Sequence, residues 1–549
     1  MNLMKSKNTI LAIFIICFLH ISPSFGQKEA IPAVLVPALN NITADEIKND
    51  IQFLADDKLA GRFPGTAGYQ QAVDYVIDRL KTLKVEPLGE NGTWLQTIRL
   101  RNAKITSEFF VINYGNGKRP EDAKNEDYVI YPNPTVTSAS CSASLVFAGY
   151  GISEPTLKYD DYNELDAKGK IVLVVRGAPD KFPSAAAAHL SSTNTILKTA
   201  AEHGAIGVII GNADSTRKTL PDMSKGVYLV LDKDGGVAVS RTYYNSQINI
   251  LAMVNYNLLN KFLESAGKNT TETLTQLRSG VSQSAPLAVS VGASFSSEYH
   301  DITSYNIIGK ISGSDKKLKT EYLVHSAHLD HLGIGKPVQG DSLYNGAHDN
   351  ASGVASLLAI ANIYKNLKVK PKRSVVLVFV TGEEMGLLGS GYFAKYPTVP
   401  IQNIIANINT DMPTIIAPLL SITALGAEHS SLIKQVNQAA GYMGLEVQDD
   451  PEPKQARFTR SDQYSFVLNG IPALHIKYGN KTADGKNNLN DLVAIWREKY
   501  YHKPQDDING LFDFEAGVKY AQLNFLIGYL IAQDDLKPIW NEGDLFGLK

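Results

Sequence analysis

The clearest hydrophobic pattern in this chain is an unbroken apolar run at 375–380, which reads Val-Val-Leu-Val-Phe-Val. Its β-branched residues and lack of polar interruptions predict a strand buried on both faces of a parallel sheet. From residue 304 onwards, such runs alternate with stretches of helical periodicity, which is typical of an α/β fold with a mostly parallel central sheet flanked by helices. Strands are expected at 306–311, 321–326, 374–381, 404–408, 420–424 and 473–476, and helices at 351–367, 431–441 and 512–533.

The segment that precedes this region predicts two helices. Thr43 and Glu46 have the spacing of a capping box, so a helix is expected over 44–54. A second amphipathic helix is expected over 69–83. The linking residues 60–65, Ala-Gly-Arg-Phe-Pro-Gly, are typical of a turn-rich loop.

Between residues 121 and 295 the pattern changes to short strands with few helices. Strands are expected at 128–131, 144–148, 171–175 and 206–210, and a helix at 195–203. No cluster of reactive residues gathers in this stretch. We therefore interpret 121–295 as an inserted β-rich domain between two parts of a larger domain, 27–120 and 296–549.

Length and charge narrow the possibilities further. A chain of 549 residues is too long for one hydrophobic core, so at least two domains are expected. The formal net charge of −2 gives no reason to expect nucleic acid or an anionic membrane surface as a partner.

The N-terminus has the pattern of a secretory signal peptide over residues 1–26. Lys5 and Lys7 precede an apolar stretch at 10–19, and Ser24-Phe-Gly26 supplies a cleavage site. We expect an exported protein, periplasmic or secreted, with no stable membrane insertion after cleavage. Cys17 would leave with the signal, so Cys141 would have no partner for an intramolecular disulfide.

Candidate chemistry gathers where the predicted strands end. Glu383 and Glu384 follow the run at 375–380, and the carboxyl ends of parallel strands are where open α/β sheets bind ligands. Paired carboxylates in such a place are costly unless a metal or substrate offsets their charge. Other strand ends supply further candidate ligands: His328, Asp349, Asp411 and, near the C-terminus, His502.

Imidazole and carboxylate without thiolate suit zinc, or less specifically manganese or cobalt. Five protein ligands are too many for one open tetrahedral site, but they suit two cations that share a carboxylate and a hydroxide. We assign Glu384 to metal binding and Glu383 to general-base catalysis. Asp330 is expected to accept the second ring N–H of His328. Tyr501 is a candidate to donate its phenol O–H to the oxyanion of a tetrahedral intermediate, and the alternative is a tyrosine that only packs.

In these motifs the chain resembles the co-catalytic zinc aminopeptidase family, which includes bacterial leucyl aminopeptidases, glutamate carboxypeptidase and the catalytically inactive transferrin receptor. The motifs are His328-Leu-Asp330, Asp349-Asn-Ala-Ser-Gly353, Glu383-Glu-Met-Gly386, Asn409-Thr-Asp411-Met412 and Tyr501-His-Lys-Pro-Gln-Asp506. The resemblance implies two Zn²⁺ ions that share one carboxylate. It assigns His328 and Asp411 to one ion, Glu384 and His502 to the other, and Asp349 to both.

The same resemblance assigns the general base to Glu383, and it extends to the inserted segment. That segment is similar to a protease-associated domain at 146–151, 169–174 and 205–210. The family often has a cis peptide bond after its shared aspartate, so one is expected at Asp349-Asn350.

The sequence departs from the family at two positions and leaves several neighbours without an assigned role. His348 stands where relatives often have an acid, and Gln463 where many have histidine; both are positions at which the substrate preference can be retuned. Asp462 is left open as a support for the ligands, a binder of the substrate amine or a helix cap. His331 is expected to turn away from the site, and Asp506 to be a solvated turn residue.

These observations best fit an exported di-zinc exopeptidase that acts on peptides. Among exopeptidases, an aminopeptidase is the first expectation. A carboxypeptidase or dipeptidase on the same scaffold needs arginines for a terminal carboxylate, for which Arg457 and Arg460 are candidates. Two further hypotheses are a non-catalytic module of receptor type and a cyclase that acts on N-terminal glutamine. Retention of all five ligands and Glu383 argues against the receptor type.

Overall fold

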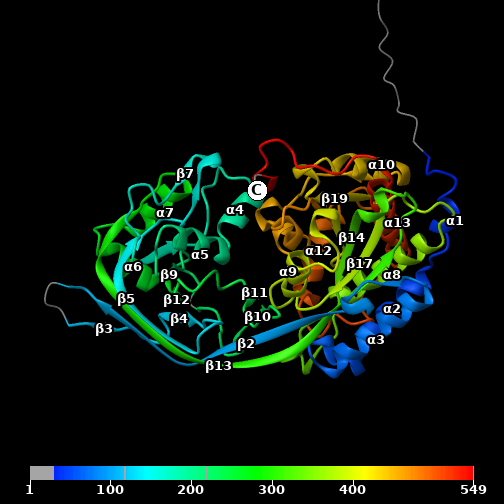
Figure 1. Cartoon of the computed structure of the whole chain (residues 1–549). Coiled ribbons are helices and arrows are strands. Elements are labelled where there is room, and N and C mark those ends of the chain that lie inside the picture. The colour runs from blue at the N-terminus through cyan, green and yellow to red at the C-terminus, as the bar shows by residue number, and fades with distance from the viewer. Residues whose placement is uncertain (1–29, 116–118, 218, 548–549) are drawn as a thin grey trace, which may run out of the picture.

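In a computed structural model of the chain, residues 30–115, 119–217 and 219–547 are described (Figure 1). The expected signal peptide, residues 1–26, lies outside these ranges. Two bodies stand side by side in Figure 1, and a pair of long strands joins them along one edge. None of the helices in the described ranges combines the length and hydropathy that a bilayer-spanning segment needs.

The larger body is built on a mixed sheet whose four central strands are parallel. Its order is β1 (Glu86–Pro87), β13 (Ala285–Ile311), β17 (Ser374–Val380), β14 (Tyr322–His328), β18 (Ile404–Asn409), β21 (Ala473–Tyr478), β19 (Ser421–Leu425) and β20 (Glu446–Val447). Strands β17, β14, β18 and β21 run parallel, while β13 and β19 border them in the opposite direction. The expected α/β fold class is confirmed.

The alternation of side chains along β17 explains its unbroken apolar sequence. Leu377 and Phe379 point into one hydrophobic core, whereas Val378 and Val380 point into a second core on the opposite face. Each such fully buried side chain contributes about 1.5–3 kcal/mol to stability relative to an exposed one. The first core is shared with α2 (Ala44–Leu54), α3 (Ala67–Thr82), α8 (Ser352–Lys365), α10 (Ile433–Met443) and α13 (Phe514–Gln533), and the second with α9 (Leu388–Lys395) and α11 (Gln463–Val467).

The N-terminal helices follow the sequence pattern closely. Helix α2 begins after Thr43, whose side chain accepts a hydrogen bond from the backbone N–H of Glu46 at 3.2 Å, as a capping residue should. Helix α3 begins after Thr66, which caps Tyr69 in the same way. The residues between the helices form a tight turn in which Arg62 is fully buried.

Two long strands connect the bodies; the first was not predicted, and the second extends far beyond the strand expected at 306–311. Strand β2 (Leu95–Asn113) pairs with β13 from Leu95 with Ile307 to Asn113 with Ser290, and Figure 1 shows both running the length of the molecule. The predicted domain limit at residue 295 falls inside β13. Residues 307–311 of β13 pair with β17 and residues 285–296 pair with β5 (Ser138–Phe147), so one strand belongs to both sheets.

The inserted body has its own parallel strands and its own core. Strands β5, β8 (Ile171–Val175), β9 (Gly207–Gly211) and β12 (Ile250–Val254) are parallel, and β4 (Tyr128–Tyr131) pairs with β12 in the opposite direction. Its helices are α4 (Ser184–Leu190), α5 (Thr193–Glu202), α6 (Tyr256–Glu264) and α7 (Thr270–Arg278). The insert is therefore less purely β than expected.

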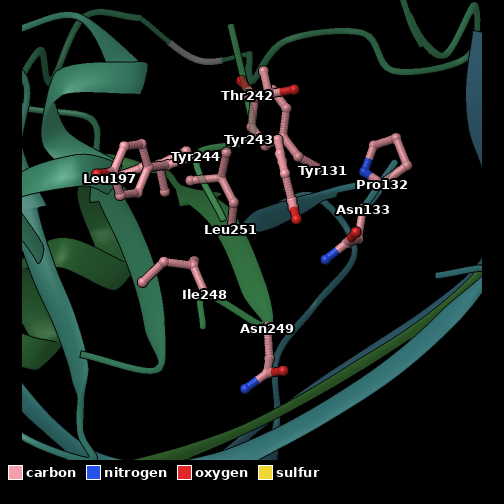
Figure 2. Close-up of a pocket in the computed structure, with 10 residues that line it drawn as sticks. All are labelled: Tyr131, Pro132, Asn133, Leu197, Thr242, Tyr243, Tyr244, Ile248, Asn249 and Leu251. Carbon is pink, nitrogen blue, oxygen red and sulfur yellow. The ribbon is translucent and has the colours of Figure 1, made fainter. Parts of the chain in front are cut away.

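A small hollow lies in this body, lined by residues from 131–133, Leu197 and the segment 242–251 (Figure 2). It encloses about 10 Å³, which is space for a single water molecule at most. No substrate-sized site is therefore found there.

Candidate metal centre

Three parallel strands bring their carboxyl ends to one edge of the sheet, and each delivers a candidate ligand there. His328 is the last residue of β14, Glu384 follows the end of β17 at Val380, and Asp411 follows the end of β18 at Asn409. The strands are neighbours in the order β17, β14, β18, so these side chains converge although they lie far apart in sequence.

The first half of the site contains His328, Asp349 and Asp411. The Nε2 atom of His328 lies 3.3 Å from Oδ1 of Asp349 and 3.4 Å from Oδ1 of Asp411. The ligand atoms of these residues lie close enough together to hold one cation. The Oδ1 atom of Asp411 is buried and accepts no hydrogen bond from the described residues, as expected for an atom reserved for a metal.

The second half contains Glu384 and His502 and uses the other oxygen of Asp349. The Nε2 atom of His502 lies 3.2 Å from Oδ2 of Asp349 and 3.2 Å from Oε2 of Glu384. Asp349 therefore directs one carboxylate oxygen to each half. All five residues expected to bind metal are brought together, and their two imidazoles and three carboxylates are a donor set that fits zinc.

The structure corrects the expectation for His331. Its imidazole is fully buried, and Nδ1 lies 2.8 Å from Oε1 of Glu384. His331, Asp349 and Glu384 also lie close enough to hold a cation together. We expected strand alternation to turn His331 away, but β14 ends at His328, so the alternation no longer applies three residues later.

The backbone around Asp349 is fixed by a cis peptide bond and by hydrogen bonds to Asp506. The peptide bond Asp349-Asn350 is cis, which confirms the expectation. The carboxylate of Asp506 accepts the backbone N–H groups of His348 at 2.9 Å and of Asp349 at 3.0 Å. Asp506 is 1% exposed, so its interpretation as a solvated turn residue was wrong; nothing in its local sequence indicates this long-range contact.

Asp330 lies beneath the two glutamates. Its carboxylate accepts the backbone N–H of Glu383 at 3.2 Å and of Glu384 at 3.4 Å. The Nδ1 atom of His328 lies 3.2 Å from the backbone carbonyl oxygen of Asp330 and 4.0 Å from its carboxylate. The buried carboxylate thus holds the loop of the glutamates, and the carbonyl faces the histidine ring.

Arg62 ties together the segments that flank this site. Its guanidinium is fully buried and donates to the backbone carbonyl oxygens of Leu329, Leu54, Asn345 and Gly346 at 2.5–3.0 Å. Burial lowers the pKa of Arg62 to about 10, so the side chain remains a cation at neutral pH. The sequence indicated only a loop here, because the carbonyls that Arg62 binds come from distant segments.

The loop of Asp411 is held in a similar way by β21. Lys477 is partly buried and donates through Nζ to the carbonyl oxygens of Asp411 at 2.7 Å and Met412 at 2.9 Å. Nε2 of His475 lies 3.0 Å from the same Asp411 oxygen. Neither residue was predicted to support the site.

The electrostatics of the cluster are those of a site built for cations. Burial disfavours charge on His502, but the carboxylates of Asp349 and Glu384 raise its pKa to about 10. Burial also opposes charge on His328, yet Asp349 and Asp411 raise its pKa well above the usual value. These imidazoles lie in a strongly negative field, which favours positive charge between the carboxylates.

Glu383 differs from Glu384 in its surroundings. Burial raises the pKa of Glu383 well above its usual value, and the carboxylate of Glu384 adds to the shift. Glu384, in contrast, lies within ion-pair distance of His331 and His502, and these contacts outweigh burial and lower its pKa. A glutamate with raised proton affinity beside the cluster has the property required of a proton carrier.

Asp462 and Tyr501 lie at the border of the cluster. Asp462 is fully buried, and neither of its carboxylate oxygens has a hydrogen-bond partner among the described residues. Burial raises its pKa to about 7. It makes no side-chain cap at the start of α11, which removes the helix-cap interpretation. The Tyr501 ring stacks on the His502 ring at a centroid distance of 3.9 Å.

The position where relatives often have histidine is filled by a hydrogen-bonded glutamine. Gln463 accepts from Nδ2 of Asn409 at 3.0 Å and donates to the carbonyl oxygen of Phe458 at 2.7 Å. It therefore supports the end of β18.

The inserted body reaches the loop of the glutamates. The side chain of Arg241 lies against Gly386, and a Cβ added there would come within 2.8 Å of its Cδ. Nδ1 of His189 lies 2.5 Å from the hydroxyl of Tyr464, and Nζ of Lys395 donates to the carbonyl oxygen of Ala238 at 3.0 Å. The insert thus borders the candidate metal centre.

Comparison with known protein families identifies two regions of the chain. Residues 306–517 match the profile of peptidase family M28, and residues 129–242 match the profile of the PA domain. Residues 306–517 thus belong to peptidase family M28 and residues 129–242 to a PA domain, which agrees with the family expected from the motifs.

Curated relatives include both kinds of exopeptidase. The chain is 27% identical over 238 residues to a probable leucine aminopeptidase 2 of Aspergillus oryzae, covering 41% of this chain and 44% of that protein. It is 28% identical over 202 residues to carboxypeptidase Q of Xenopus laevis, covering 36% of this chain and 41% of that protein. The chain thus matches less than half the length of either relative.

Among solved structures, an aminopeptidase from Aneurinibacillus sp. strain AM-1 has the same fold. The superposition has a TM-score of 0.50 and covers 90% of this chain and 95% of that one, at 19% identity. At 19% identity the similarity shows a shared fold and no more.

Proposed function

We propose that this protein is an exported zinc-dependent aminopeptidase, which removes N-terminal residues from peptides at a centre of two Zn²⁺ ions. The observation that carries the proposal is the position of Asp349. Its Oδ1 lies 3.3 Å from His328, and its Oδ2 lies 3.2 Å from His502. One carboxylate that faces two sets of ligands is the arrangement required for a shared pair of cations.

His328 and Asp411 would hold one ion, Glu384 and His502 the other, and Asp349 both. His331 is close enough to Glu384 to support the second set. When bound, the ions would polarise the carbonyl of the scissile peptide bond and increase the acidity of water.

Glu383 is proposed as the general base and acid. Its carboxylate takes the proton of the attacking water and then passes it to the nitrogen of the leaving amine. Burial raises the pKa of Glu383 and bound cations would lower it, and a balance of the two suits a carboxylate that must both take and return a proton. Asp330 keeps the loop of Glu383 in place through two backbone hydrogen bonds.

Tyr501 is proposed to donate its phenol O–H to the carbonyl oxygen of the substrate as negative charge develops there. Hydrogen-bond donors fixed before the reaction stabilise such an oxyanion without a cost of reorganisation. The stacking of Tyr501 on His502 keeps the phenol beside the centre.

The charges around the centre favour an amino group over a carboxylate as the recognised end of the peptide. Asp462 offers a buried carboxylate without a hydrogen-bond partner in the described structure, which suits the cationic α-amine. The candidates for binding a terminal carboxylate are less suitable. Arg457 forms ion pairs with Asp450 and Glu452, and Arg460 is exposed. Carboxypeptidase or dipeptidase activity is the second candidate, favoured by the match to carboxypeptidase Q.

A panel of blocked peptides tests the proposal. Purified protein should cleave a peptide with a free amine and an amidated carboxyl end, but leave its N-acetylated counterpart intact. A chelator should abolish the cleavage, and added zinc should restore it. The products are measured by mass spectrometry.

Other results would point elsewhere. Cleavage of a further peptide, N-acetylated but with a free carboxyl end, would identify a carboxypeptidase, and a requirement for both free ends would identify a dipeptidase. Release of ammonia from N-terminal glutamine without cleavage would identify a cyclase. Absence of all activity in the zinc-loaded protein would favour a binding module.

A further inference from the structure

Arg497 lies on the ring of Tyr501, at the point where helix α12 (Leu489–Tyr500) ends. The guanidinium carbon is 4.3 Å from the centroid of the tyrosine ring. The His502 ring lies 3.9 Å from the same centroid and nearly parallel, at 23°. Two flat groups at these distances cannot share one face of a phenol ring, so Tyr501 lies between Arg497 and His502.

The helix end sets this geometry. The backbone N–H of Tyr501 donates to the carbonyl oxygen of Arg497 at 3.1 Å, which closes the last turn. Residues four apart lie on one face of a helix, so the arginine side chain is directed onto the ring.

Among the described residues no carboxylate forms an ion pair with Arg497. The contrast with Arg457 is informative, because Arg457 has ion-pair contacts with both Asp450 and Glu452. Arg497 is half-buried, and its described side-chain contact is with the aromatic face. A cation over a tyrosine ring is attracted by the π electrons and draws electron density away from the hydroxyl.

We infer that Arg497 is a positioning residue for catalysis, which holds the Tyr501 ring against His502 and makes its hydroxyl a stronger donor to the carbonyl oxygen of the substrate. The inference rests on the proposed function. It predicts that the contribution of Arg497 to the reaction passes through the hydroxyl of Tyr501. Cation–π attraction of this kind corresponds to a rate effect of roughly 3- to 30-fold.

A purely structural role must be separated from this one. A cation in the last turn of a helix stabilises that end through the helix dipole. Lys499 lies in the same turn and is exposed, so it supplies a matched control. Lys499→Met removes the same charge from the helix end without touching the Tyr501 ring.

The test compares Arg497→Met, Arg497→Lys, Lys499→Met, Tyr501→Phe and the double variant Arg497→Met/Tyr501→Phe in the zinc-loaded enzyme. Arg497→Met should lower kcat by roughly 3- to 30-fold with little change in KM, and Arg497→Lys should recover part of the loss. Lys499→Met should retain the wild-type kcat. In the Tyr501→Phe background, the arginine substitution should change kcat by less than about twofold.

Binding and stability supply readouts that do not depend on turnover. A phosphinic dipeptide analogue, whose tetrahedral centre carries the oxyanion, should bind Arg497→Met more weakly by a factor similar to that in kcat. Zinc content and unfolding temperature should equal those of Lys499→Met.

An equal loss of kcat from Arg497→Met in the presence and absence of the Tyr501 hydroxyl would overturn the inference, and so would an equal loss in Lys499→Met. These results would leave the proposed function intact, because the wild-type enzyme would still cleave peptides. A zinc-loaded wild-type protein without peptidase activity would contradict both the proposed function and this inference.

Discussion

Glu383→Gln is expected to lower kcat by roughly 10²- to 10⁴-fold while the zinc content of the protein stays at its wild-type value. Glutamine has nearly the same shape as glutamate but cannot take a proton from water or return one to the leaving amine. Burial raises the proton affinity of Glu383, whereas bound cations would lower it, and this balance suits a carboxylate that transfers a proton in both directions.

The adjacent residue supplies the contrast. Glu384→Gln removes a charged ligand that lies 3.2 Å from His502, so it should reduce zinc content as well as activity. Steady-state kinetics and metal analysis of the two variants distinguish the roles. A Glu383→Gln enzyme with near wild-type kcat would contradict the general-base assignment, and a loss of zinc from this variant would make Glu383 a ligand instead.

Arg62→Met is expected to lower the free energy of unfolding by about 3–5 kcal/mol and to weaken zinc binding. The substitution removes a buried cation and its hydrogen bonds to the carbonyl oxygens of Leu329, Leu54, Asn345 and Gly346, of which Gly346 keeps the backbone N–H of Ala351 as a donor. Leu329 follows His328 directly, and Gly346 lies three residues before Asp349. Loss of the clamp should therefore loosen both ligand segments.

Arg373→Met is the matched control for this prediction. Arg373 is equally buried and binds Glu321 and the carbonyls of Ile531 and Asp534, in contacts that involve none of the candidate ligands. The Arg373→Met variant should lose a similar free energy of unfolding. Its folded form should bind zinc with wild-type affinity. Denaturant unfolding and competition with a chelator measure the two quantities. Equal zinc affinity in both variants would show that Arg62 only stabilises the fold.

Most of the secondary structure of the larger domain could be predicted from hydrophobic pattern. The run at 374–381 became β17, and the helix expected at 44–54 has the same limits in α2. These elements bury their apolar faces in the way that their local sequences indicate. The length of β2 and β13 could not be predicted, because the middle of each strand is stabilised by pairing with the other and is only partly buried.

The candidate ligands could be predicted because each lies at the end of a strand or in a motif of recognisable spacing. The residues that support them have no such signal. Asp506 holds the backbone of Asp349 from 157 residues away, and Arg62 reaches Gly346 across 284 residues. A single sequence contains no record of such contacts. His331 was misjudged for a different reason, since a strand periodicity was extended beyond the end of the strand.

The most direct test of this account is a crystal structure of the zinc-loaded protein, with diffraction measured on either side of the zinc absorption edge. Two anomalous peaks are expected, one on each side of the Asp349 carboxylate: the first beside His328 and Asp411, the second beside Glu384 and His502. A single peak, or zinc bound away from Asp349, would contradict the paired centre and the mechanism built on it.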